Sequence, residues 1–509
     1  MNLNRRNFLF GSAAATALAG CATNKVGVRA LKPGEKRRVA MIGYGIQMRS
    51  TLLPSFLGKA KGTEKVRDLV TVVAVCDCDK VRREAGKKAV DDSYKNSDCK
   101  AVADFREIVR DPTIDAVCIA TPDHWHAYMS VEAMKHGKDV YCEKPLTFCV
   151  DEAKKVIAAQ KKYDRVFQTG SMQRSWDVFR TAVMIVRNGF IGDVMYVDAN
   201  YGKGGAKLGG PSHPVRFFDE PKNAATEGAP NADVDWDMWL GPAKWRPYSD
   251  QLAPRGVNKF YPMFWRFDDD IGTGYNGDWG AHHLDIAQWG LDMDRSGPYK
   301  IIRSDEPYSD NLFHGGRRQF GMKMLFKKPY GDVELYHGPF GTWGTVFYGT
   351  KGIVAVNRGK IAVWLGSGVK PTAEIRKQLA DASFAGMTLV AASIGKDYGT
   401  DAQVKKDNAL ADALAALKKR FDLDHAAVQL YKSSNQILNF VECIESRKPT
   451  ISPAEVGGRG AILCQLCNMS YVYDTGFDWD PAKNDFSGCN KMGLSLTRDA
   501  YRNGWEVVV

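Results

Sequence analysis

The sequence has no long apolar run after its first twenty residues and no strongly biased composition. Of its 509 residues, 44% are hydrophobic and 25% are charged, which is ordinary for a globular protein and unlike a collagen-like or disordered chain. Because no run of about 18 apolar residues follows the N-terminus, the body of the protein is not predicted to span a membrane. The length exceeds that of one typical domain and predicts two domains with insertions.

Basic residues are numerous, but they are not clustered. The formal charge of +11 falls to +9 without residues 1–20, because Arg5 and Arg6 leave with no acidic residue among them. The chain has no stripe of Lys and Arg with interleaved aromatic residues, so nucleic acid is not expected as a partner.

The N-terminal residues predict an export signal. The stretch NRRNFLFGSAAATALAGC joins the twin arginine Arg5–Arg6 to an apolar segment that is too short for a membrane helix. The arginine pair favours the twin-arginine route, which carries folded proteins, and predicts a periplasmic location. LAGC at residues 18–21 is similar to a lipoprotein cleavage site, which would make Cys21 a lipidated first residue and the sole membrane attachment. The alternative is an ordinary cut near ALA, with Cys21 incidental.

Eleven cysteines in an exported chain suggest disulfides. Some of them, however, occupy apolar, strand-like stretches in which a free cysteine behaves as a small hydrophobe, namely Cys76, Cys78, Cys118 and Cys142. Cys464 and Cys467 form a C-x-x-C in a helix-like run with no second pair and no histidine nearby, so no metal site is expected there. The sequence does not pair the remaining cysteines.

A glycine turn follows the first apolar strand, Val39–Ile42, in the stretch KRRVAMIGYGIQMRS. In a dinucleotide-binding fold, Gly43 would allow the tight turn, and Gly45 with Ile46 would let the backbone approach a pyrophosphate at a helix N-terminus. Met48 replaces the third glycine of G-x-G-x-x-G, so the turn is a weak signal that depends on its context.

The second strand supplies that context. The stretch LVTVVAVCDCD ends in Asp77, where an acid would accept hydrogen bonds from an adenosine ribose. Its carboxylate would repel a 2′-phosphate, which favours NAD over NADP, although Arg82 and Arg83 lie nearby. Strands and helices alternate through residues 37–172, which predicts a doubly wound parallel sheet. The motifs TPDHWH and CEKP both follow strands, at the edge of such a sheet that faces the ligand crevice.

The stretch IATPDHWHAYMSVEAMKHGKDVYCEKPL resembles the signature of the Gfo/Idh/MocA oxidoreductases, the family of glucose–fructose oxidoreductase and inositol dehydrogenase. The resemblance covers nearly the whole chain after the signal and is strongest at 114–147 and 262–292. It implies an N-terminal Rossmann domain followed by an α+β domain with an open, mainly antiparallel sheet, through which a homo-oligomer would form. The boundaries are 1–35 for the signal and linker, 36–172 for the NAD-binding domain, 173–485 for the substrate and oligomerisation domain, and 486–509 for a segment that packs back.

The same resemblance implies which residues serve the cofactor and the substrate. The implied cofactor-binding residues are Gly43, Gly45, Ile46, Asp77, Thr121, Pro122, His124, His126, Glu143, Lys144 and Pro145. The implied substrate-binding residues are Lys144, Arg174, Tyr275, Asp278 and His282.

The catalytic prediction rests on the stretch GTGYNGDWGAHHLDIAQWGLDM, residues 272–293. If Trp279–Met293 is helical, Asp278 and His282 share a face. These two residues match the family's D-x-x-x-H pair, in which the histidine is the base for a sugar hydroxyl and the aspartate orients it. An imidazole can take that proton near neutral pH, and the ammonium of Lys144 can stabilise the developing alkoxide or relay the proton itself.

After residue 172 the strand–helix alternation stops, and short alternating segments predict the antiparallel sheet. Residues 206–265 are rich in Pro, Trp and Gly, and their aromatic rings either stack on sugars or pin a long loop to the core. Residues 366–425 form a helical insertion that could be a lid, an oligomer contact or a solvated appendage.

These features predict an NAD-dependent oxidoreductase acting on a secondary hydroxyl of a sugar, glycoside or polyol. Because an exported enzyme has no obvious NAD pool, the cofactor is expected to stay bound and to be recycled. The alternative is an NAD-dependent glycosidase that works through transient oxidation and elimination. A third hypothesis, suggested by Met48, is a non-catalytic surface lipoprotein that binds carbohydrate. The particular sugar and the carbon oxidised do not follow from the sequence.

Overall fold

The computed structural model describes residues 27–200, 227–257, 264–268, 270–274, 276–303, 322–338, 341, 343–380, 384, 386–394, 407–473, 475–488 and 493–509. The predicted export signal, Cys21 and Tyr275 lie outside the described residues. None of the described helices is both long and apolar enough to cross a bilayer.

The first half of the chain alternates strands and helices. Its elements are β1 (Arg37–Ile42), η1 (Met48–Leu52), α1 (Leu53–Phe56), α2 (Val66–Leu69), β2 (Val70–Cys76), α3 (Lys80–Tyr94), β3 (Lys100–Val102), α4 (Phe105–Arg110), β4 (Ala116–Ile119), α5 (Asp123–Lys135), β5 (Asp139–Cys142), α6 (Val150–Tyr163) and β6 (Phe167–Thr169). All strand pairs are parallel, in the order β3-β2-β1-β4-β5-β6. Side chains that alternate along β1 enter different clusters, since Ala40 and Ile42 pack with α4 and α5, whereas Val39 and Met41 pack with α3 and the later helix α14 (Gln436–Ser446). Both faces of the sheet are therefore covered.

The second half is built around a larger sheet. Its elements are η2 (Met172–Ser175), α7 (Asp177–Arg187), β7 (Val194–Asn200), α8 (Trp236–Leu240), α9 (Phe264–Phe267), η5 (Asn276–Gly280), α10 (Ala281–Gly290), β8 (Lys300–Arg303), β9 (Met322–Lys328), β10 (Gly331–Gly338), β11 (Thr345–Gly349), β12 (Gly352–Asn357), β13 (Lys360–Leu365), α11 (Ala373–Ala380), β14 (Thr388–Ser393), α13 (Asn408–Arg420), α15 (Ala454–Val472), β15 (Phe477–Asp480), β16 (Asp485–Phe486) and η7 (Arg502–Gly504). The strand order is β14-β13-β12-β11-β7-β10-β9-β8-β15-β16, and only the β7–β10 pair is parallel. The predicted fold class is confirmed.

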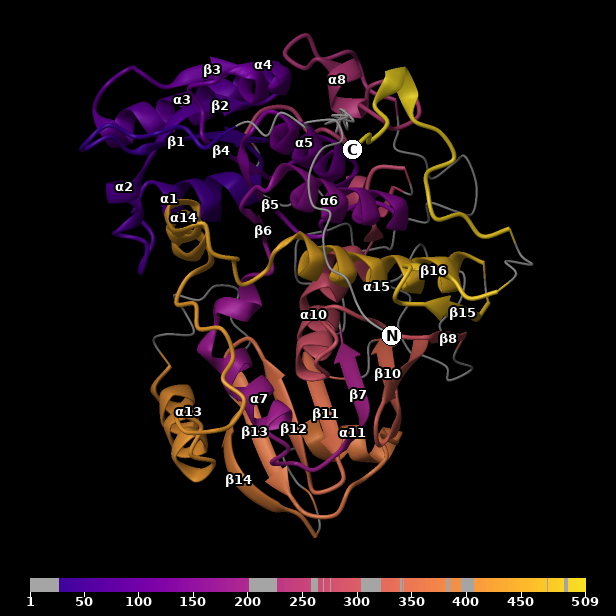
Figure 1. The fold of residues 1–509 in the computed structure, drawn as a ribbon. Coiled ribbons are helices and arrows are strands. Elements are labelled where there is room, and N and C mark those ends of the chain that lie inside the picture. Colours follow the sequence, from indigo (N-terminus) through magenta and orange to yellow (C-terminus); the bar gives the residue numbers. More distant parts are fainter. Residues whose placement is uncertain are drawn as a thin grey trace, which may run out of the picture.

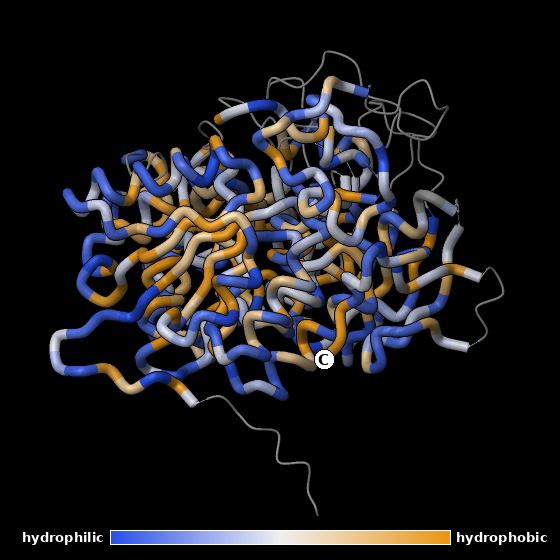
Figure 2. Tube along the Cα trace, turned by 90° about the horizontal axis from the view of Figure 1, so that it is seen from above, coloured by the Kyte–Doolittle hydropathy of each residue, from blue (hydrophilic) through white to orange (hydrophobic). Residues whose placement is uncertain are grey.

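The two sheets lie at opposite ends of the molecule, and α15 and α10 lie between them (Figure 1). Helix α15 contacts α6 and β6 of the first sheet and α10, β8 and β9 of the second half. The chain later returns to the first half, where Trp505 and Val507 join the cluster around α4 and α5. The view from above shows apolar segments concentrated inside the described chain and hydrophilic ones toward its outside (Figure 2).

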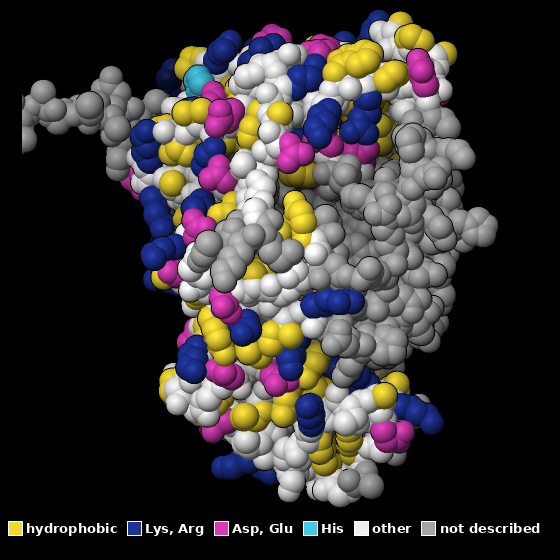
Figure 3. Space-filling model, turned by 90° about the vertical axis from the view of Figure 1, so that its right-hand side faces the viewer, with side chains coloured by type: hydrophobic (Ala, Val, Ile, Leu, Met, Phe, Trp, Pro, Cys, Tyr) yellow, Lys and Arg dark blue, Asp and Glu magenta, His cyan; other side chains and the backbone are white. Residues whose placement is uncertain are grey.

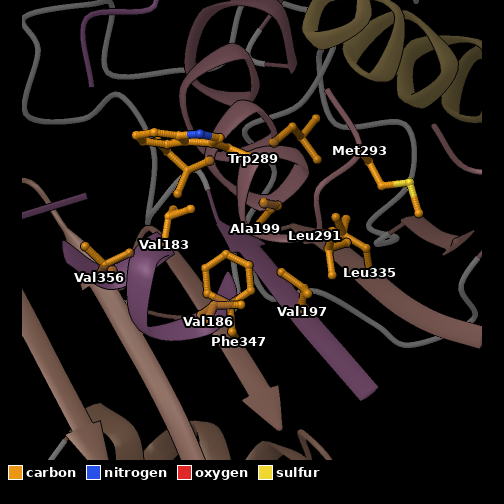
Figure 4. Close-up of a cluster of buried hydrophobic side chains, with 14 of the residues drawn as sticks. Val183, Val186, Val197, Ala199, Trp289, Leu291, Met293, Leu335, Phe347 and Val356 are labelled. Carbon is orange, nitrogen blue, oxygen red and sulfur yellow. The ribbon is translucent and has the colours of Figure 1, made fainter. Parts of the chain in front are cut away.

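One face of the large sheet carries the main core. Helices α7 and α10 pack on it, with Val183 and Val186 of α7 and Trp289 of α10 close to Val197, Phe347 and other sheet side chains (Figure 4). Every residue of α10 from Ala281 to Gly290 is buried. A helix buried all round is held by its neighbours rather than by amphipathicity, and α10 contacts α7, α15 and the strands β7 and β11.

The predicted insertion at 366–425 is part of the sheet rather than a detached appendage. Strand β14 pairs with β13 as the edge strand, and α13 packs on the core face. Helix α11 covers the opposite face, where Leu379 packs near Trp364 and Tyr348. Residues 395–406 lie outside the described part. The sequence missed β14 because its side chains are mostly half-exposed and the segment does not alternate clearly.

The described cysteines are unpaired. Nine are free, and Cys118, Cys142, Cys464 and Cys467 are fully buried or nearly so. They pack as small apolar side chains, with Cys464 and Cys467 inside α15. On the face drawn in Figure 3, Lys and Arg side chains are interspersed with Asp and Glu among the described residues.

Candidate active site

The glycine turn after β1 has the geometry that a dinucleotide requires. Gly43 has a φ of +84°, and a Cβ atom there would lie 2.8 Å from the carbonyl oxygen of Ala120, so only glycine fits. A Cβ atom on Gly45 would meet nothing within 4 Å, which leaves room beside the backbone where Ile46 begins a helical run. Met48 is fully buried and begins the π-helical turn η1. At this position of the dinucleotide motif a third glycine would allow close packing of helix and strand, and the wider π turn takes its place.

Asp77 follows β2 directly and carries the carboxylate expected at the ribose. Its Oδ2 accepts the backbone N–H of Tyr44 at 2.7 Å, and its Oδ1 accepts that of Asp79 at 2.9 Å. Arg82 bonds to the Asp79 carboxylate at 3.3 Å and to the carbonyl oxygen of Pro254 at 2.8 Å. An acid at the ribose position, with the nearby arginine engaged elsewhere, fits NAD better than NADP.

Thr121 and Pro122 lie between β4 and α5, beside the glycine turn. The Thr121 hydroxyl is buried and has no hydrogen-bond partner among the described residues, and its methyl group lies 3.0 Å from the Cβ position of Gly43. Buried hydroxyls are normally satisfied, so a ligand donor or acceptor is expected here. Gly43, Gly45, Asp77 and Thr121 thus form a cradle that fits NAD.

His126 is buried and joins two loops at this edge of the sheet. Its Nδ1 lies 2.7 Å from the carbonyl oxygen of Pro145, and its Nε2 lies 2.9 Å from that of Thr121. Because carbonyl oxygens only accept, both ring nitrogens must donate, and the ring is an imidazolium. Burial opposes this charge, but Cys142, Asp123 and the Pro145 carbonyl raise the pKa of His126 to about 10.

His124 and His126, both predicted cofactor-binding residues, are buried in the first turn of α5. His124 is 1% exposed, and its Nε2 lies 3.1 Å from the carbonyl oxygen of Trp239. Burial and the nearby Arg498 lower the pKa of His124 to about 3, so this ring is neutral. Both nitrogens of the His126 ring bond to backbone carbonyls, and so does Nε2 of His124, whereas Nδ1 of His124 has no hydrogen-bond partner among the described residues.

Glu143 has a similar supporting position. Its Oε1 accepts a bond from Nε2 of Gln47 at 3.1 Å, and its Oε2 accepts the backbone N–H of Lys144 at 3.3 Å. Burial raises the pKa of Glu143. The side chain therefore links the end of β5 to the helix after β1 and helps to position the Lys144–Pro145 segment.

Lys144 and Asp278 are in direct contact. The ammonium donates to Oδ1 of Asp278 at 2.6 Å and to the carbonyl oxygen of the same residue at 2.8 Å. Nε of Arg266 lies 3.8 Å from the same Oδ1. Burial opposes ionisation of the carboxyl, but the charges of Lys144 and Arg266 outweigh it and lower the pKa of Asp278 to about 2. A charged lysine and a charged carboxylate thus meet where the two halves of the chain join.

His282 lies one turn beyond Asp278 and is neutral. It is 7% exposed, and burial together with the charges of Arg358 and Lys144 lowers the pKa of His282 well below 6.5. Its Nδ1 has no hydrogen-bond partner among the described residues. The Trp279 ring lies 5.8 Å from the imidazole, edge to face. A neutral imidazole can accept a proton, so this ring can serve as a base.

The prediction that Asp278 orients His282 is corrected by these contacts. The Asp278 carboxylate is engaged by Lys144 instead. The expected helix Trp279–Met293 is also different, since the π-helical turn η5 contains Asp278, and α10 begins only at Ala281. A π turn changes the angular spacing of side chains, so four residues no longer mean one α-helical face.

Arg174 does not reach the substrate side, which corrects another prediction. It is 1% exposed and binds the carboxylate of Asp285 through Nε and Nη2, both at 2.8 Å. It also binds Asp294 at 2.7 and 2.9 Å, and its guanidinium lies 5.1 Å from the Trp289 ring centre. The guanidinium is committed to holding α10 in place.

Sequence reasoning missed two arginines at the site. Arg266 comes from the short helix α9, and Arg358 from the turn between β12 and β13. The Arg358 guanidinium lies 4.8 Å from the ring centre of Trp279 and donates from Nε to Gln173 at 2.9 Å. The partly buried ring of Trp279 lies beside both the Arg358 guanidinium and the His282 ring. Neither FWRF (264–267) nor VNRGK (356–360) has a sequence pattern that predicts a position near His282. The sheet topology brings these distant segments to the site.

A buried polar chain holds η5 against the first half. A Cβ atom on Gly277 would lie 1.6 Å from Oγ1 of Thr273, so glycine is required for this contact. Thr273 donates from its N–H and its hydroxyl to Asp123, at 3.0 and 2.7 Å. Asn276 donates to Asn468 of α15 at 2.7 Å. The position of Asp278 is therefore tied to the loop that begins α5.

Two family models match the chain. One is described as an oxidoreductase family with an NAD-binding Rossmann fold and matches residues 37–171. The other is described as the C-terminal alpha/beta domain of the same oxidoreductase family and matches residues 215–320.

Among curated proteins, an uncharacterised oxidoreductase ORF334 of Rhizobium meliloti is 32% identical over 157 residues, 31% of this chain and 43% of that protein. A glycosyl hydrolase family 109 protein of Shewanella baltica (strain OS155 / ATCC BAA-1091) is 27% identical over 219 residues, 39% of this chain and 46% of that protein. The chain spans less than half the length of these curated relatives.

Among solved structures, a levoglucosan dehydrogenase in complex with NADH and levoglucosan has a TM-score of 0.53 at 15% identity, over 88% of this chain and 100% of that chain. An aldose-aldose oxidoreductase from Caulobacter crescentus, complexed with glycerol, has a TM-score of 0.50 at 16% identity, over 87% and 100%. At these identities the similarity shows the fold alone. The chain thus contains the NAD-binding domain of the Gfo/Idh/MocA oxidoreductases at residues 37–171, where the NAD cradle lies, and a segment of their C-terminal domain at residues 215–320.

Proposed function

We propose that the protein transfers a hydride to or from a carbon that carries a secondary hydroxyl in a sugar, glycoside or polyol. The observation that carries this proposal is the meeting of the Lys144 ammonium, the Asp278 carboxylate and the neutral ring of His282 at the carboxyl edge of the nucleotide-binding sheet. When bound, NAD supplies the hydride acceptor, and the chain supplies position and charge.

The three side chains have complementary roles in this proposal. Oxidation of an alcohol releases the hydroxyl proton, which neutral His282 can accept. The ammonium of Lys144 stabilises the alkoxide that forms, and Asp278 holds that ammonium in place. Lys144 as the formal base is the second version. A pH–rate profile tests the first version, because burial lowers the pKa of His282 well below 6.5 and a base of this kind gives a rate that does not rise with pH above neutrality.

We also propose that NAD remains bound and is recycled between an oxidation and a reduction. The fold is shared with an aldose-aldose oxidoreductase, whose name describes redox exchange between two sugars. In that scheme one sugar reduces the bound cofactor and another reoxidises it, so that no soluble NAD pool is needed.

A net glycosidase is the second candidate. Glycosyl hydrolase family 109 proteins are among the relatives, at 27% identity over 219 residues. Transient oxidation of a glycoside, elimination of the leaving group, addition of water to the resulting double bond and a final reduction would use the same lysine, aspartate and histidine. The products differ, because this route releases free sugar without net redox change.

The first experiment is to purify the folded protein without added nucleotide, denature it and analyse the supernatant for NAD, NADH and NADP by mass spectrometry. Stoichiometric NAD(H) supports the proposal, and the loaded protein is then given sugar pairs and p-nitrophenyl glycosides. Keto-sugars or lactones from one sugar and polyols from the other indicate the oxidoreductase, whereas p-nitrophenol release without added NAD indicates the glycosidase. An empty protein that does not bind added NAD would favour a carbohydrate-binding surface lipoprotein.

Export remains a proposal of its own. The twin arginine Arg5–Arg6 and the LAGC stretch support a periplasmic protein with a lipid on Cys21. Cell fractionation and the mass of the mature N-terminus test both points, since an Arg5→Lys/Arg6→Lys variant should stay in the cytoplasm, and a Cys21→Ser variant should lose the lipid. A homo-oligomer is also proposed, and light scattering of the purified protein tests it.

A further inference from the structure

A segment of the second half is bonded directly to the turn that follows Asp77. The backbone N–H of Lys80 donates to the carbonyl oxygen of Asp233 at 2.7 Å, and that of Asp235 donates to the carbonyl oxygen of Cys78 at 3.1 Å. These bonds flank an antiparallel bridge between Asp79 and Val234. We call residues 231–254 the strap.

The far end of the strap returns to the same turn. Arg82, in the first turn of α3, donates from Nη2 to the carbonyl oxygen of Pro254 at 2.8 Å. The Asp79 carboxylate accepts from Nε of this arginine at 3.3 Å and from its backbone N–H at 3.2 Å. The strap is thus attached at both ends to the residues next to the expected ribose position.

The middle of the strap is bonded to α5. Nε1 of Trp125 donates to the carbonyl oxygens of Met238 and Trp239, at 3.1 and 3.3 Å. A Cβ atom on Gly241 would lie 2.2 Å from the Trp125 ring, so the strap backbone lies directly on the indole. Trp125 is 3% exposed. In Figure 1 the short helix of the strap, α8, lies beside α4 and α5 at the nucleotide-binding end of the molecule.

The strand order shows where these contacts lie relative to the expected nucleotide. Strand β1 lies between β2 and β4 in the sheet, so its glycine turn lies between the turn after β2 and the start of α5. The strap is bonded to both of these walls. In doubly wound sheets the nucleotide occupies the crevice at the carboxyl ends of the strands.

We propose that the strap covers the adenosine half of NAD and makes its release slow. The cover consists of this chain's own residues and is bonded mainly through backbone carbonyls, so it does not depend on a particular sugar substrate. The inference rests on the proposed recycling of NAD, because a cofactor used in two successive half-reactions must not leave between them. Slow release is a property of binding and can be measured without any sugar.

The test is the rate at which bound NADH leaves the full-length protein. NADH is loaded, a large excess of NAD is added, and the loss of bound NADH fluorescence is followed. We expect a residence time on the order of minutes or longer for the unmodified protein. Arg82→Ala and Trp125→Phe each remove a side-chain anchor, and each should speed release about five-fold, the typical contribution of one hydrogen bond. The double variant should be about 25-fold faster.

Matched controls come from the same elements. Arg83→Ala removes a neighbouring arginine of α3 that bonds to the Asp77 carbonyl at 3.4 Å and not to the strap. Trp505→Phe removes an indole N–H of the same aromatic cluster, and this N–H has no hydrogen-bond partner among the described residues. Both controls should release NADH at the unmodified rate.

The outcomes separate this inference from the proposed function. If Arg82→Ala and Trp125→Phe release NADH at the rate of the controls, the proposal that the strap slows NADH release is wrong. Release within milliseconds from the unmodified protein would also overturn it, and would leave the oxidoreductase proposal standing if sugars still reduce added NAD. No binding of NADH at all would overturn both.

Discussion

The ammonium of Lys144 lies 2.6 Å from Oδ1 of Asp278 and 2.8 Å from the carbonyl oxygen of the same residue. Lys144 follows strand β5 of the nucleotide-binding sheet, and Asp278 lies in the π turn that precedes α10. The contact therefore joins the two halves of the molecule. Since Lys144 and Arg266 lower the pKa of the carboxyl to about 2, against the effect of burial, Asp278 is ionised throughout the neutral range.

We expect Asp278→Asn to remove catalysis while NAD binding is kept. The amide fills the same space but cannot balance the lysine charge, so hydride transfer should slow about 100-fold or more. The measurement is the single-turnover reduction of bound NAD by the active sugar, beside a fluorescence titration with NADH. Asp292→Asn is the matched control, because this exposed aspartate follows α10 and forms its ion pair with Arg187. An unchanged single-turnover rate in Asp278→Asn would remove the aspartate from the mechanism.

The charged state of His126 predicts a pH-dependent stability. Its pKa is raised from 6.5 in the unfolded chain to about 10, so its contribution is complete below pH 6.5 and is lost as the pH rises toward 10. We expect His126→Gln to lower the free energy of unfolding by several kcal/mol more at pH 6 than near pH 10, because each unit of pKa shift corresponds to about 1.4 kcal/mol. Urea denaturation of both proteins across this range measures the difference.

His124→Gln is the control for that series. Burial lowers the pKa of His124 to about 3, so its ring is neutral from pH 6 to 10, and the cost of its replacement should not change with pH over this range. A His126→Gln difference that is equally constant would show that the His126 ring is neutral in the folded protein. Nitrogen-15 spectra of histidine-labelled protein at pH 8 give an independent readout, since an imidazolium has both ring nitrogens protonated.

Arg174 is predicted to matter for stability rather than for substrate affinity. Its removal leaves the buried carboxylate of Asp285 without its main counter-charge, so Arg174→Met should lower the free energy of unfolding by about 3 kcal/mol. Replacing both partners, as in Arg174→Met/Asp285→Leu, should recover part of the loss. A variant with unchanged unfolding but a raised sugar KM would instead support a role in substrate binding.

Asp77 should set the choice between NAD and NADP. Asp77→Ser removes the carboxylate that would bind the ribose hydroxyls and repel a 2′-phosphate. We expect the Kd for NAD to rise about ten-fold and the preference over NADP to narrow, measured by fluorescence titration with both reduced cofactors. Arg82 is held by Asp79 and the Pro254 carbonyl, so NADP should still not bind tightly. Equal affinities in the unmodified protein would contradict the assignment.

Several features follow from local sequence because their cause is local. The strand before Gly43, the acid that ends the second strand and the regular alternation to residue 172 each reflect hydrophobic periodicity or a backbone requirement within a few residues. The same is true of the Lys144–Pro145 segment at the end of β5. From these elements the fold of the first half and its cofactor can be predicted.

Side-chain partners across the two halves could not be predicted in this way. The sequence spacing of Asp278 and His282 indicates a pair on one helical face, but the aspartate is taken by a lysine 134 residues earlier in the chain. The sequence predicts that Arg174 binds substrate. In the structure Arg174 is buried against α10, and a buried charge requires a counter-charge, which Asp285 supplies. The π turn at η5 gives no signal of its own.

What the sequence by itself determined is the parallel nucleotide-binding sheet, its glycine turn and the residue types needed for proton transfer. Only the tertiary structure decided that Asp278 serves Lys144, that His126 is a buried cation joining two loops, and that residues 231–254 lie across the walls of the cofactor crevice. The physical reason is that strand periodicity and turn geometry act over a few residues. Ion pairs and backbone bonds between distant segments depend instead on how the two sheets pack around α10 and α15.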